Sequence, residues 1–304
     1  MAGRPRAVVL TALPAAGLEL LSGRMAVEAG GDTAGASAIV TDPSIAVDAG
    51  FLDAAGGSLA VVANFGVGYD NIDLDAARAR GVRITNTPGV LTDATAELAV
   101  ALMLAAARRI AEADATIRRG EWARAGELIG RELVGATVGL VGFGRIGRRV
   151  AELLRGFDVR LLVTSRSSTE PREGAEQREL HDLLGRSDFV SVHVPLTAET
   201  RHLIDADALA AMKPGAILVN TSRGAVLDTD ALIEALRSGR PGSAGLDVYE
   251  SEPHVPQALR ELPNTVLLPH VGSATARTRN AMARLCAENV IAVIDGRDPP
   301  ASVV

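Results

Sequence analysis

The sequence has one cysteine, Cys286, and aromatic residues make up only 3% of it. A single cysteine cannot form an intramolecular disulfide, so nothing ties the chain to an oxidising compartment. With so few aromatic rings, the cores must be built from the Ala, Val and Leu within the 47% hydrophobic fraction. This composition suits helices packed on a parallel sheet, whose strands are covered on both faces.

The sequence also lacks a basic cluster and a membrane-spanning run. Its 31 Lys and Arg and 37 Asp and Glu residues give a net charge of −6, which argues against a nucleic-acid or anionic-membrane partner. The longest apolar stretch, Leu98–Ala107, is flanked by Glu97 and Arg108 and is shorter than the roughly 18 residues of a membrane span. We therefore expect a cytoplasmic protein without nucleic-acid or membrane partners.

The N-terminus superficially resembles a signal peptide, because Arg4 and Arg6 precede the apolar stretch Ala7–Ala16. Pro14 and Glu19, however, favour a strand, a turn and a helix over a cleaved leader. We expect the segment to belong to the folded protein.

Short apolar segments alternate with helical ones along the whole chain, which indicates an α/β fold. A chain of 304 residues is long enough for two domains. We predict two Rossmann/flavodoxin-like, doubly wound parallel-sheet domains, one formed by residues 1–98 plus 283–304 and the other by residues 99–282. Long helices are expected from Thr92 to about Arg119 and over Ala274–Ile294. Strands are expected at Ala7–Leu10, Ala38–Val40, Leu59–Ala63, Val82–Asn86, Thr137–Gly142, Val159–Val163, Phe189–His193, Ile217–Asn220, Ala244–Val248 and Val266–Leu268.

A dinucleotide-binding fingerprint, GFGRIG, stands between an apolar strand and the predicted helix Arg148–Leu154. Gly142 permits a tight turn, Gly144 lets the backbone approach a pyrophosphate, and Gly147 allows close helix packing. The phosphates would bind N–H groups at the helix N-terminus. We place Arg145 and Ile146 in the same cofactor site. A glycine-rich turn without a ligand is the alternative interpretation.

The residues after the next strand bear on the choice of cofactor. An NAD enzyme usually carries an acid there for the adenosine ribose, but this chain has Thr164, Ser165, Arg166 and Ser167. A carboxylate would repel a 2′-phosphate, whereas Arg166 between hydroxyl groups can bind one. The segment therefore favours NADPH, with a solvated surface arginine as the alternative.

Three later loops each follow an apolar strand, so they lie at the strand ends where doubly wound sheets bind ligands. They contain a cation, a carboxylate and a histidine: Arg223, Glu252 and His270. Reduction of a 2-oxo acid needs a cation for the carboxylate and a proton donor that is kept charged. Singly, each residue has a structural alternative: Arg223 a salt-bridge residue, Glu252 a surface acid and His270 a hydrogen-bonded structural histidine. The loops are Asn220–Gly224, Asp247–Pro253 and Leu268–Ser273.

Together and in this order, these motifs resemble those of the D-isomer-specific 2-hydroxyacid dehydrogenase family. The resemblance covers nearly the whole chain. Its motifs are NFGVGYDNIDL from Asn64, NTPGVLTDATAEL from Asn86, VGFGRIG from Val141, VHVPLTAET from Val192, NTSRGAVLD from Asn220, AGLDVYESEP from Ala244 and LLPHVGSAT from Leu267.

The resemblance implies the catalytic roles. The TSRG arginine, Arg223, would hold the substrate carboxylate together with backbone N–H groups of the GVG loop. The PHxG histidine, His270, would be the acid/base, and Glu252 rather than Glu250 would be its partner. The implied substrate-binding residues are Val67, Gly68, Arg223, His270 and Ser273.

The resemblance also implies how the cofactor is held. Asp247 and the Thr221 backbone would orient the nicotinamide carboxamide, Pro195 would lie near the adenosine, and Gly272 would belong to the same site. Thr164 departs from the commonest pattern, because NAD-type members carry Asp there. We expect NADPH to be preferred, with NADH possible, and we predict no metal site.

For the whole protein, the resemblance implies an NAD(P)-dependent reduction of a small 2-oxo acid. The site would lie in the cleft between a substrate-binding domain, residues 1–98 plus 283–304, and a dinucleotide-binding domain, residues 99–282. A homodimer is expected, with the helix after Thr92 at the interface.

Within the family, the chain looks most like the glyoxylate/hydroxypyruvate reductases. Arg166, LTDATAEL from Leu91, GSATARTRN from Gly272 and the short C-terminus carry this likeness. Phosphoglycerate, D-lactate and phosphite-oxidising dehydrogenases remain alternatives. Formate dehydrogenases are disfavoured, because they use glutamine in the role of Glu252. A dinucleotide-binding corepressor is the alternative from a different functional class.

Overall fold

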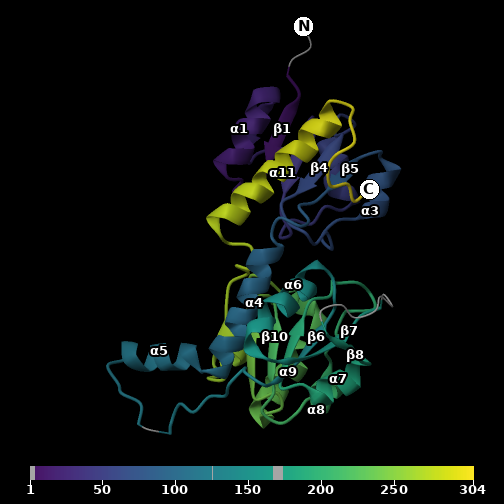
Figure 1. Ribbon diagram of the computed structural model, residues 1–304. Coiled ribbons are helices and arrows are strands. Elements are labelled where there is room, and N and C mark those ends of the chain that lie inside the picture. The colour runs from purple at the N-terminus through teal and green to yellow at the C-terminus, as the bar shows by residue number, and fades with distance from the viewer. Residues whose placement is uncertain (1–3, 125, 167–173) are drawn as a thin grey trace. The chain divides into compact units, whose positions relative to one another are not determined.

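The computed structural model describes residues 4–124, 126–166 and 174–304, and it forms two compact units (Figure 1). Unit 1 comprises Met1–Leu91 and Ser273–Val304, and unit 2 comprises Thr92–Gly272. The boundaries expected from the sequence, after residues 98 and 282, fall inside the helices α4 and α11. Each of these helices belongs whole to one unit, since a continuous helix is a rigid element.

In its described residues, unit 1 contains a five-stranded parallel sheet with the order β2-β1-β3-β4-β5. Helix α11 packs against α1 and β4 of this unit. Gly17 of α1 permits this approach, because a Cβ there would lie 2.7 Å from the carbonyl oxygen of Ala283. The elements are β1 Arg6–Val9, α1 Ala15–Arg24, β2 Ala26–Ala29, β3 Ala38–Thr41, α2 Ala49–Ala55, β4 Val61–Asn64, α3 Leu74–Ala79, β5 Arg83–Thr85 and α11 Ala276–Ile294.

The described part of unit 2 contains a seven-stranded parallel sheet with the order β12-β11-β10-β9-β6-β7-β8. Together with unit 1, it confirms the predicted α/β fold with two doubly wound parallel sheets. The elements are α4 Thr92–Ala107, α5 Ile110–Arg118, β6 Thr137–Val141, α6 Arg145–Leu154, η1 Arg155–Phe157, β7 Arg160–Thr164, β8 Glu176–Gln177, α7 Leu180–Arg186, β9 Phe189–Val192, α8 Ala206–Ala211, β10 Ile217–Asn220, η2 Gly224–Val226, α9 Thr229–Ser238, β11 Ser243–Leu246, α10 Gln257–Arg260 and β12 Thr265–Leu267.

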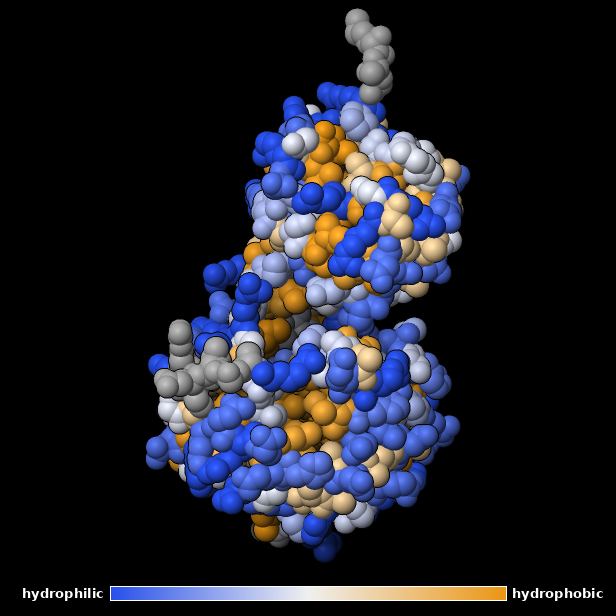
Figure 2. All heavy atoms as spheres, turned by 90° about the vertical axis from the view of Figure 1, so that its right-hand side faces the viewer, coloured by the Kyte–Doolittle hydropathy of each residue, from blue (hydrophilic) through white to orange (hydrophobic). Residues whose placement is uncertain are grey.

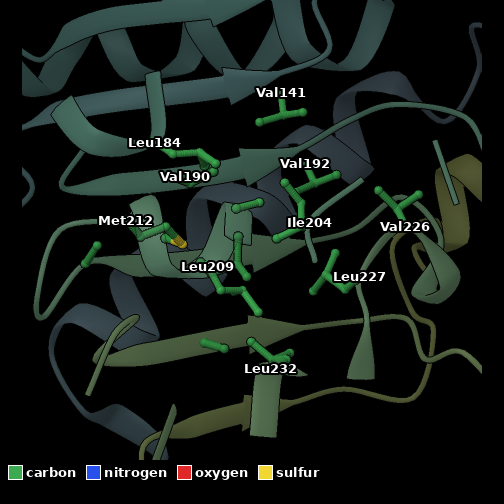
Figure 3. Close-up of a cluster of buried hydrophobic side chains, with 14 of the residues drawn as sticks. Val141, Leu184, Val190, Val192, Ile204, Leu209, Met212, Val226, Leu227 and Leu232 are labelled. Carbon is green, nitrogen blue, oxygen red and sulfur yellow. The ribbon is translucent and has the colours of Figure 1, made fainter. Parts of the chain in front are cut away.

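The strands of unit 2 are apolar throughout because both faces of the sheet are buried. On β10, Leu218 belongs to one hydrophobic cluster, while Ile217 and Val219 belong to the cluster on the other face. Figure 3 shows the first cluster, in which Val190 and Val192 of β9 lie near Ile204. Strand order reverses between β6 and β9, which makes their carboxyl ends the expected ligand-binding edge.

The long helix expected from Thr92 to about Arg119 is in fact two helices, so that prediction was wrong. Arg109 adopts a left-handed conformation with φ 52° between α4 and α5. Its guanidinium donates to both carboxylate oxygens of Glu112, at 2.9 and 2.8 Å, and to the carbonyl oxygen of Glu127 at 2.7 Å. These contacts stabilise the break in the helical pattern.

Two edge strands, β2 and β8, were not expected from the sequence. Strand β2 is largely exposed, and β8 has only two residues, so neither produces an apolar run. Helix α6 also begins earlier than predicted, at Arg145 rather than Arg148. Gly147 therefore lies inside the helix.

The molecular surface in Figure 2 is mainly hydrophilic, with smaller hydrophobic patches. Among the described residues, no helix has both the length and the apolarity that a membrane span requires.

Candidate functional site

The fingerprint loop lies at the carboxyl end of β6, beside the end of β9. Gly142 has φ +99°, and a Cβ there would lie 2.7 Å from the carbonyl carbon and oxygen of His193. At Gly147, a Cβ would lie 2.3 Å from the carbonyl oxygen of Gly142. Both positions exclude any larger residue, so the loop and α6 pack as closely as the fingerprint predicts.

Gly144 differs from its two neighbours in the motif because the space beside it is open. A Cβ at Gly144 would meet no atom within 4 Å. Gly144 is the N-cap of α6, makes no side-chain capping bond, and is followed by Arg145 and Ile146. The first amide groups of such a helix need acceptors, and an anion can supply them. These residues therefore fit the pyrophosphate of a dinucleotide.

The loop after β7 carries Ser165 and Arg166. The Arg166 Nη1 atom lies 3.7 Å from Oε2 of Glu199, and the two side chains are 70% and 69% exposed. Glu199 was missed in the sequence, although it stands in the quoted VHVPLTAET motif with Pro195. An exposed ion pair is weak, so it does not prevent Arg166 from binding a phosphate. Ser167 lies outside the described residues.

The loop after β10 is ordered by Asn220, whose side chain is fully buried. Asn220 Oδ1 accepts hydrogen bonds from the backbone N–H and hydroxyl of Ser222 at 2.9 and 2.8 Å, and its Nδ2 donates to the carbonyl oxygen of Arg223 at 2.8 Å. Thr221 is nearly buried, and within the described structure its hydroxyl has no hydrogen-bond partner. It is a buried polar group that the loop itself leaves unsatisfied.

Asp247 connects the end of β11 to the loop that carries His270. Its carboxylate accepts the Val271 and Gly272 N–H groups at 2.7 and 2.8 Å, and its carbonyl oxygen accepts the His270 N–H at 2.9 Å. Burial raises the pKa of Asp247, and these amide bonds oppose the rise. His270 itself has φ +54°. The carbonyl and carboxylate oxygens of Asp247 therefore together hold the left-handed turn that presents the imidazole.

His270 and Glu252 are in direct contact. His270 Nδ1 lies 2.7 Å from Glu252 Oε2, and Glu252 Oε1 accepts the Tyr249 N–H at 2.8 Å. Burial alone would raise the pKa of Glu252, but the His270 hydrogen bond and charge, the Tyr249 amide and the charge of Arg223 hold the pKa below its usual value. The contact orients the ring and leaves Nε2 as the atom for proton exchange.

Glu250, the other acid of this loop, is engaged elsewhere. Its Oε1 lies 2.7 Å from His202 Nε2, and its Oε2 accepts the Thr229 hydroxyl at 3.0 Å. The Tyr249 hydroxyl donates to the carbonyl oxygen of Leu268 at 2.9 Å, so it ties the Glu252 loop to the strand end before His270. These supporting contacts of Glu250 and Tyr249 were not expected from the sequence.

Arg223 and Glu252 lie on neighbouring loops because Gly224 allows a very close approach. A Cβ at Gly224 would lie 1.8 Å from the carbonyl carbon of Tyr249 and 2.3 Å from the Glu250 nitrogen. The structure thus brings Arg223, Glu252 and His270 together in unit 2.

Val67 and Gly68 lie in unit 1, after β4. Their carbonyl oxygens accept the side-chain amides of Asn86, at 2.8 Å, and Asn64, at 2.6 Å. In the part of the chain that the structure describes, neither Val67 nor Gly68 donates its own N–H to a protein acceptor. Ser273 belongs to the same unit. Sequence reasoning missed Asn64 and Asn86, although each begins a quoted motif.

Similarity to known proteins agrees with this arrangement. Residues 100–272 match the family described as D-isomer specific 2-hydroxyacid dehydrogenase, NAD binding domain. The chain belongs to this family, and it is a nicotinamide-dinucleotide-dependent dehydrogenase that reduces 2-oxo acids. Unit 2 contains all of the matched residues.

Within the family, the chain is similar to glyoxylate reductases. One from Thermococcus kodakarensis is 46% identical over 99% of this chain and 96% of its own length. The TT0316 protein of Thermus thermophilus is 44% identical, with a TM-score of 0.92 over 98% of this chain and 100% of its own. An NADPH-dependent glyoxylate/hydroxypyruvate reductase from Sinorhizobium meliloti, solved with NADP and malonate, is 37% identical, with a TM-score of 0.91 over 99% of this chain and 97% of its own.

Replacing Gly224 with Ala should disrupt the site through sterics alone. The new Cβ would overlap the Tyr249 backbone and push the Arg223 and Glu252 loops apart, and a displacement of about 1 Å can cost ~100-fold in rate. We expect kcat/KM for the 2-oxo acid to fall at least ~100-fold, together with a lower Tm. The matched control is Gly156→Ala, where a Cβ meets nothing within 4 Å. Wild-type kinetics for Gly224→Ala would contradict the proposed loop contact.

Proposed function

We propose that this protein reduces glyoxylate and hydroxypyruvate to their 2-hydroxy acids and prefers NADPH as the reductant. The observation that carries the proposal is the 2.7 Å contact between His270 and Glu252, on a loop that Gly224 brings against the Arg223 loop. The glyoxylate reductase relatives support this choice of substrate.

The bound cofactor would be held by the Gly142–Gly147 loop, with Pro195, Thr221, Asp247 and Gly272 in the same site. When bound, a reduced nicotinamide supplies a hydride to the carbonyl carbon of the substrate. The Gly272 N–H is already bonded to Asp247, so we infer that Gly272 contributes close backbone approach rather than a free donor.

The chain's own residues perform the remaining work. The Arg223 guanidinium binds the substrate carboxylate, and the Val67 and Gly68 N–H groups donate to the same anion. His270 gives its proton to the carbonyl oxygen from Nε2, and Glu252 at Nδ1 stabilises the charged ring beforehand. Ser273 would line the substrate side. These roles make unit 1 the substrate-binding part and unit 2 the dinucleotide-binding part.

Replacing His270 or Arg223 with Ala should remove most turnover of glyoxylate and hydroxypyruvate while leaving folding and NADPH binding intact. Loss of one positioned proton donor typically costs about 10²–10⁴-fold in rate. Steady-state kinetics with glyoxylate, hydroxypyruvate, pyruvate and 3-phosphohydroxypyruvate would measure the effect and the substrate preference together. Near wild-type kcat/KM in either variant, or preference for one of the last two acids, would contradict the proposal.

The Glu252→Gln variant tests the proton donor through the pH profile. Since the pKa of Glu252 is lowered, the carboxylate stays ionised through the neutral range and favours protonated His270 there. The neutral amide of Gln cannot stabilise positive charge on the ring that it contacts, so the alkaline limb of the reduction rate should move to lower pH. An unmoved limb would show that the contact has no electrostatic role.

NADPH preference is supported by the residues after β7. Thr164 ends the strand without a carboxylate, and the exposed Arg166 can face a 2′-phosphate. The Sinorhizobium relative was solved with NADP. Glu199, near Arg166, opposes this preference. Because both side chains are exposed, screening by solvent keeps that opposition small.

The Arg166→Ala variant should raise KM for NADPH about tenfold with little change for NADH, at the lower end of what a charge-assisted hydrogen bond contributes. Thr164→Asp should add repulsion against the phosphate and give NADH a ribose acceptor. Glu199→Gln, which removes the competing carboxylate, should lower KM for NADPH. Steady-state kinetics with both cofactors would test the preference. An equal rise in KM for NADPH and NADH at Arg166→Ala, or a wild type that prefers NADH, would show that Arg166 is only a surface arginine.

We further propose a homodimer formed through the α5 segment, which runs from the start of α5 at Ile110 to the start of β6 at Thr137. Figure 1 shows α5 and the chain leading to β6 extending away from the sheet of unit 2. Of the six large hydrophobic residues exposed in the described chain, five lie in this segment, and such clustering marks an interaction surface. A cavity of about 470 Å³ lined by Ile129 and Val266 lies beside it, at the amino ends of β10 to β12. The five residues are Ile110, Ile117, Trp122, Ile129 and Val134.

The double variant Trp122→Ser, Ile129→Ser should convert the dimer to a monomer at micromolar concentration, because it removes two of the most exposed apolar side chains, 86% and 74% exposed. Sedimentation equilibrium would measure the mass. Tyr69→Ser, at an exposed aromatic residue of unit 1, is the control. A monomeric wild type, or a double variant that stays dimeric, would contradict the interface.

A cytoplasmic location is part of the same proposal. Cys286 is a free thiol, fully buried in unit 1, and burial raises its pKa to about 12. As the single cysteine, it has no partner for an intramolecular disulfide, so nothing in the chain calls for an oxidising compartment.

A further inference from the structure

Arg279 stands at the carboxyl edge of the sheet in unit 1, outside every role assigned above. It lies in the first turns of α11, after the N-cap Thr275. Its guanidinium carbon lies 5.5 Å from the centroid of the Phe65 ring, within the range of a cation–π contact. Phe65 is 4% exposed and immediately precedes the loop that contains Val67 and Gly68.

The charge of Arg279 is poorly compensated by the protein itself. Among the described residues, no carboxylate lies within 4.0 Å of it, and Asp42 is the acid whose charge reaches it. One oxygen of that acid, Oδ1, accepts the Ser44 N–H at 2.9 Å. Burial lowers the pKa of Arg279, and Asp42 opposes this. A cation is also disfavoured at a helix N-terminus by the helix dipole.

The loop beside Arg279 is otherwise tightly anchored. The Phe65 N–H donates to the carbonyl oxygen of Thr41 at 2.7 Å, and a Cβ on Gly66 would lie 2.8 Å from Pro43 Cγ. As described above, side-chain amides hold the next two carbonyl groups. The Phe65 ring is the part of this loop that Arg279 contacts.

We propose that Arg279 is a positioning residue for substrate binding: it stacks on Phe65, fixes the start of the loop whose Val67 and Gly68 N–H groups receive the carboxylate, and adds positive charge there. The inference rests on the proposed function. Arg279 acts through Phe65 and touches no reacting atom. Its contribution is therefore the same for bound substrate and transition state, and such uniform binding appears in KM rather than in kcat.

The experiment compares Arg279→Gln, Arg279→Lys and the matched control Arg277→Gln, an exposed arginine two residues earlier on α11. Kinetics with glyoxylate at saturating NADPH would give KM and kcat, and titration would give the NADPH Kd. We expect Arg279→Gln to raise KM about tenfold, with kcat and the NADPH Kd changed by less than about twofold. Lys keeps the charge but not the planar stack, so its KM should lie between. The control should match wild type.

The outcomes separate this inference from the proposed function. Wild-type protein that reduces neither glyoxylate nor hydroxypyruvate would overturn the proposed function, whatever the variants do. An active wild type whose Arg279→Gln variant keeps its KM, or changes no more than Arg277→Gln, would overturn the inference alone. A fall in kcat, a weaker NADPH Kd and a lower Tm together would also overturn it, because they would show a merely structural residue. Inhibition by oxamate, a non-reducible 2-oxo acid analogue, should weaken in parallel with KM.

Discussion

The buried carboxylate of Asp247 is the constraint on which the arrangement of the site depends. Its backbone N–H donates to Asn220 at 3.0 Å, its carbonyl oxygen accepts the His270 N–H, and its side chain accepts the next two amides. One residue therefore joins the loop of Arg223 to the loop of His270. A buried carboxylate is costly unless hydrogen bonds satisfy it, and here the amides that satisfy it also fix the left-handed turn at His270. The same hydrogen bonds therefore position the imidazole and stabilise this edge of the sheet.

The topology explains why three loops far apart in sequence form one site. Strands β10, β11 and β12 are neighbours in the sheet and all run parallel, so their carboxyl ends meet at one edge. Parallel order alone brings loops near each other, but it does not set their separation. Close contact between the first two loops requires Gly224, and contact between the second and third uses the Tyr249 hydroxyl and Glu252.

Much of this could be predicted from the sequence, because it depends on local patterns. Apolar strands buried on both faces, and glycines at Gly142 and Gly147, have strong signals. The helix break at Arg109, the edge strands β2 and β8, and the supporting roles of Asn64 and Asn86 could not be predicted, because each depends on partners distant in sequence. Arg109, for example, donates to Glu127, and Asn86 is fixed by Val67 and by Asn289 of α11. The residue roles in catalysis rest on the family resemblance and stay predictions.

The two units differ in how many of their polar and charged groups have a hydrogen-bond or ion-pair partner within the protein. In unit 2, His270 is paired with Glu252, and the carboxylate of Asp247 accepts two amides, so protein contacts alone orient these side chains. In unit 1, the Val67 and Gly68 N–H groups have no acceptor among the described residues, while Arg279 contacts the ring of Phe65 beside them. Under the proposed function, unit 2 would supply the preorganised proton donor and unit 1 the N–H groups for the substrate carboxylate.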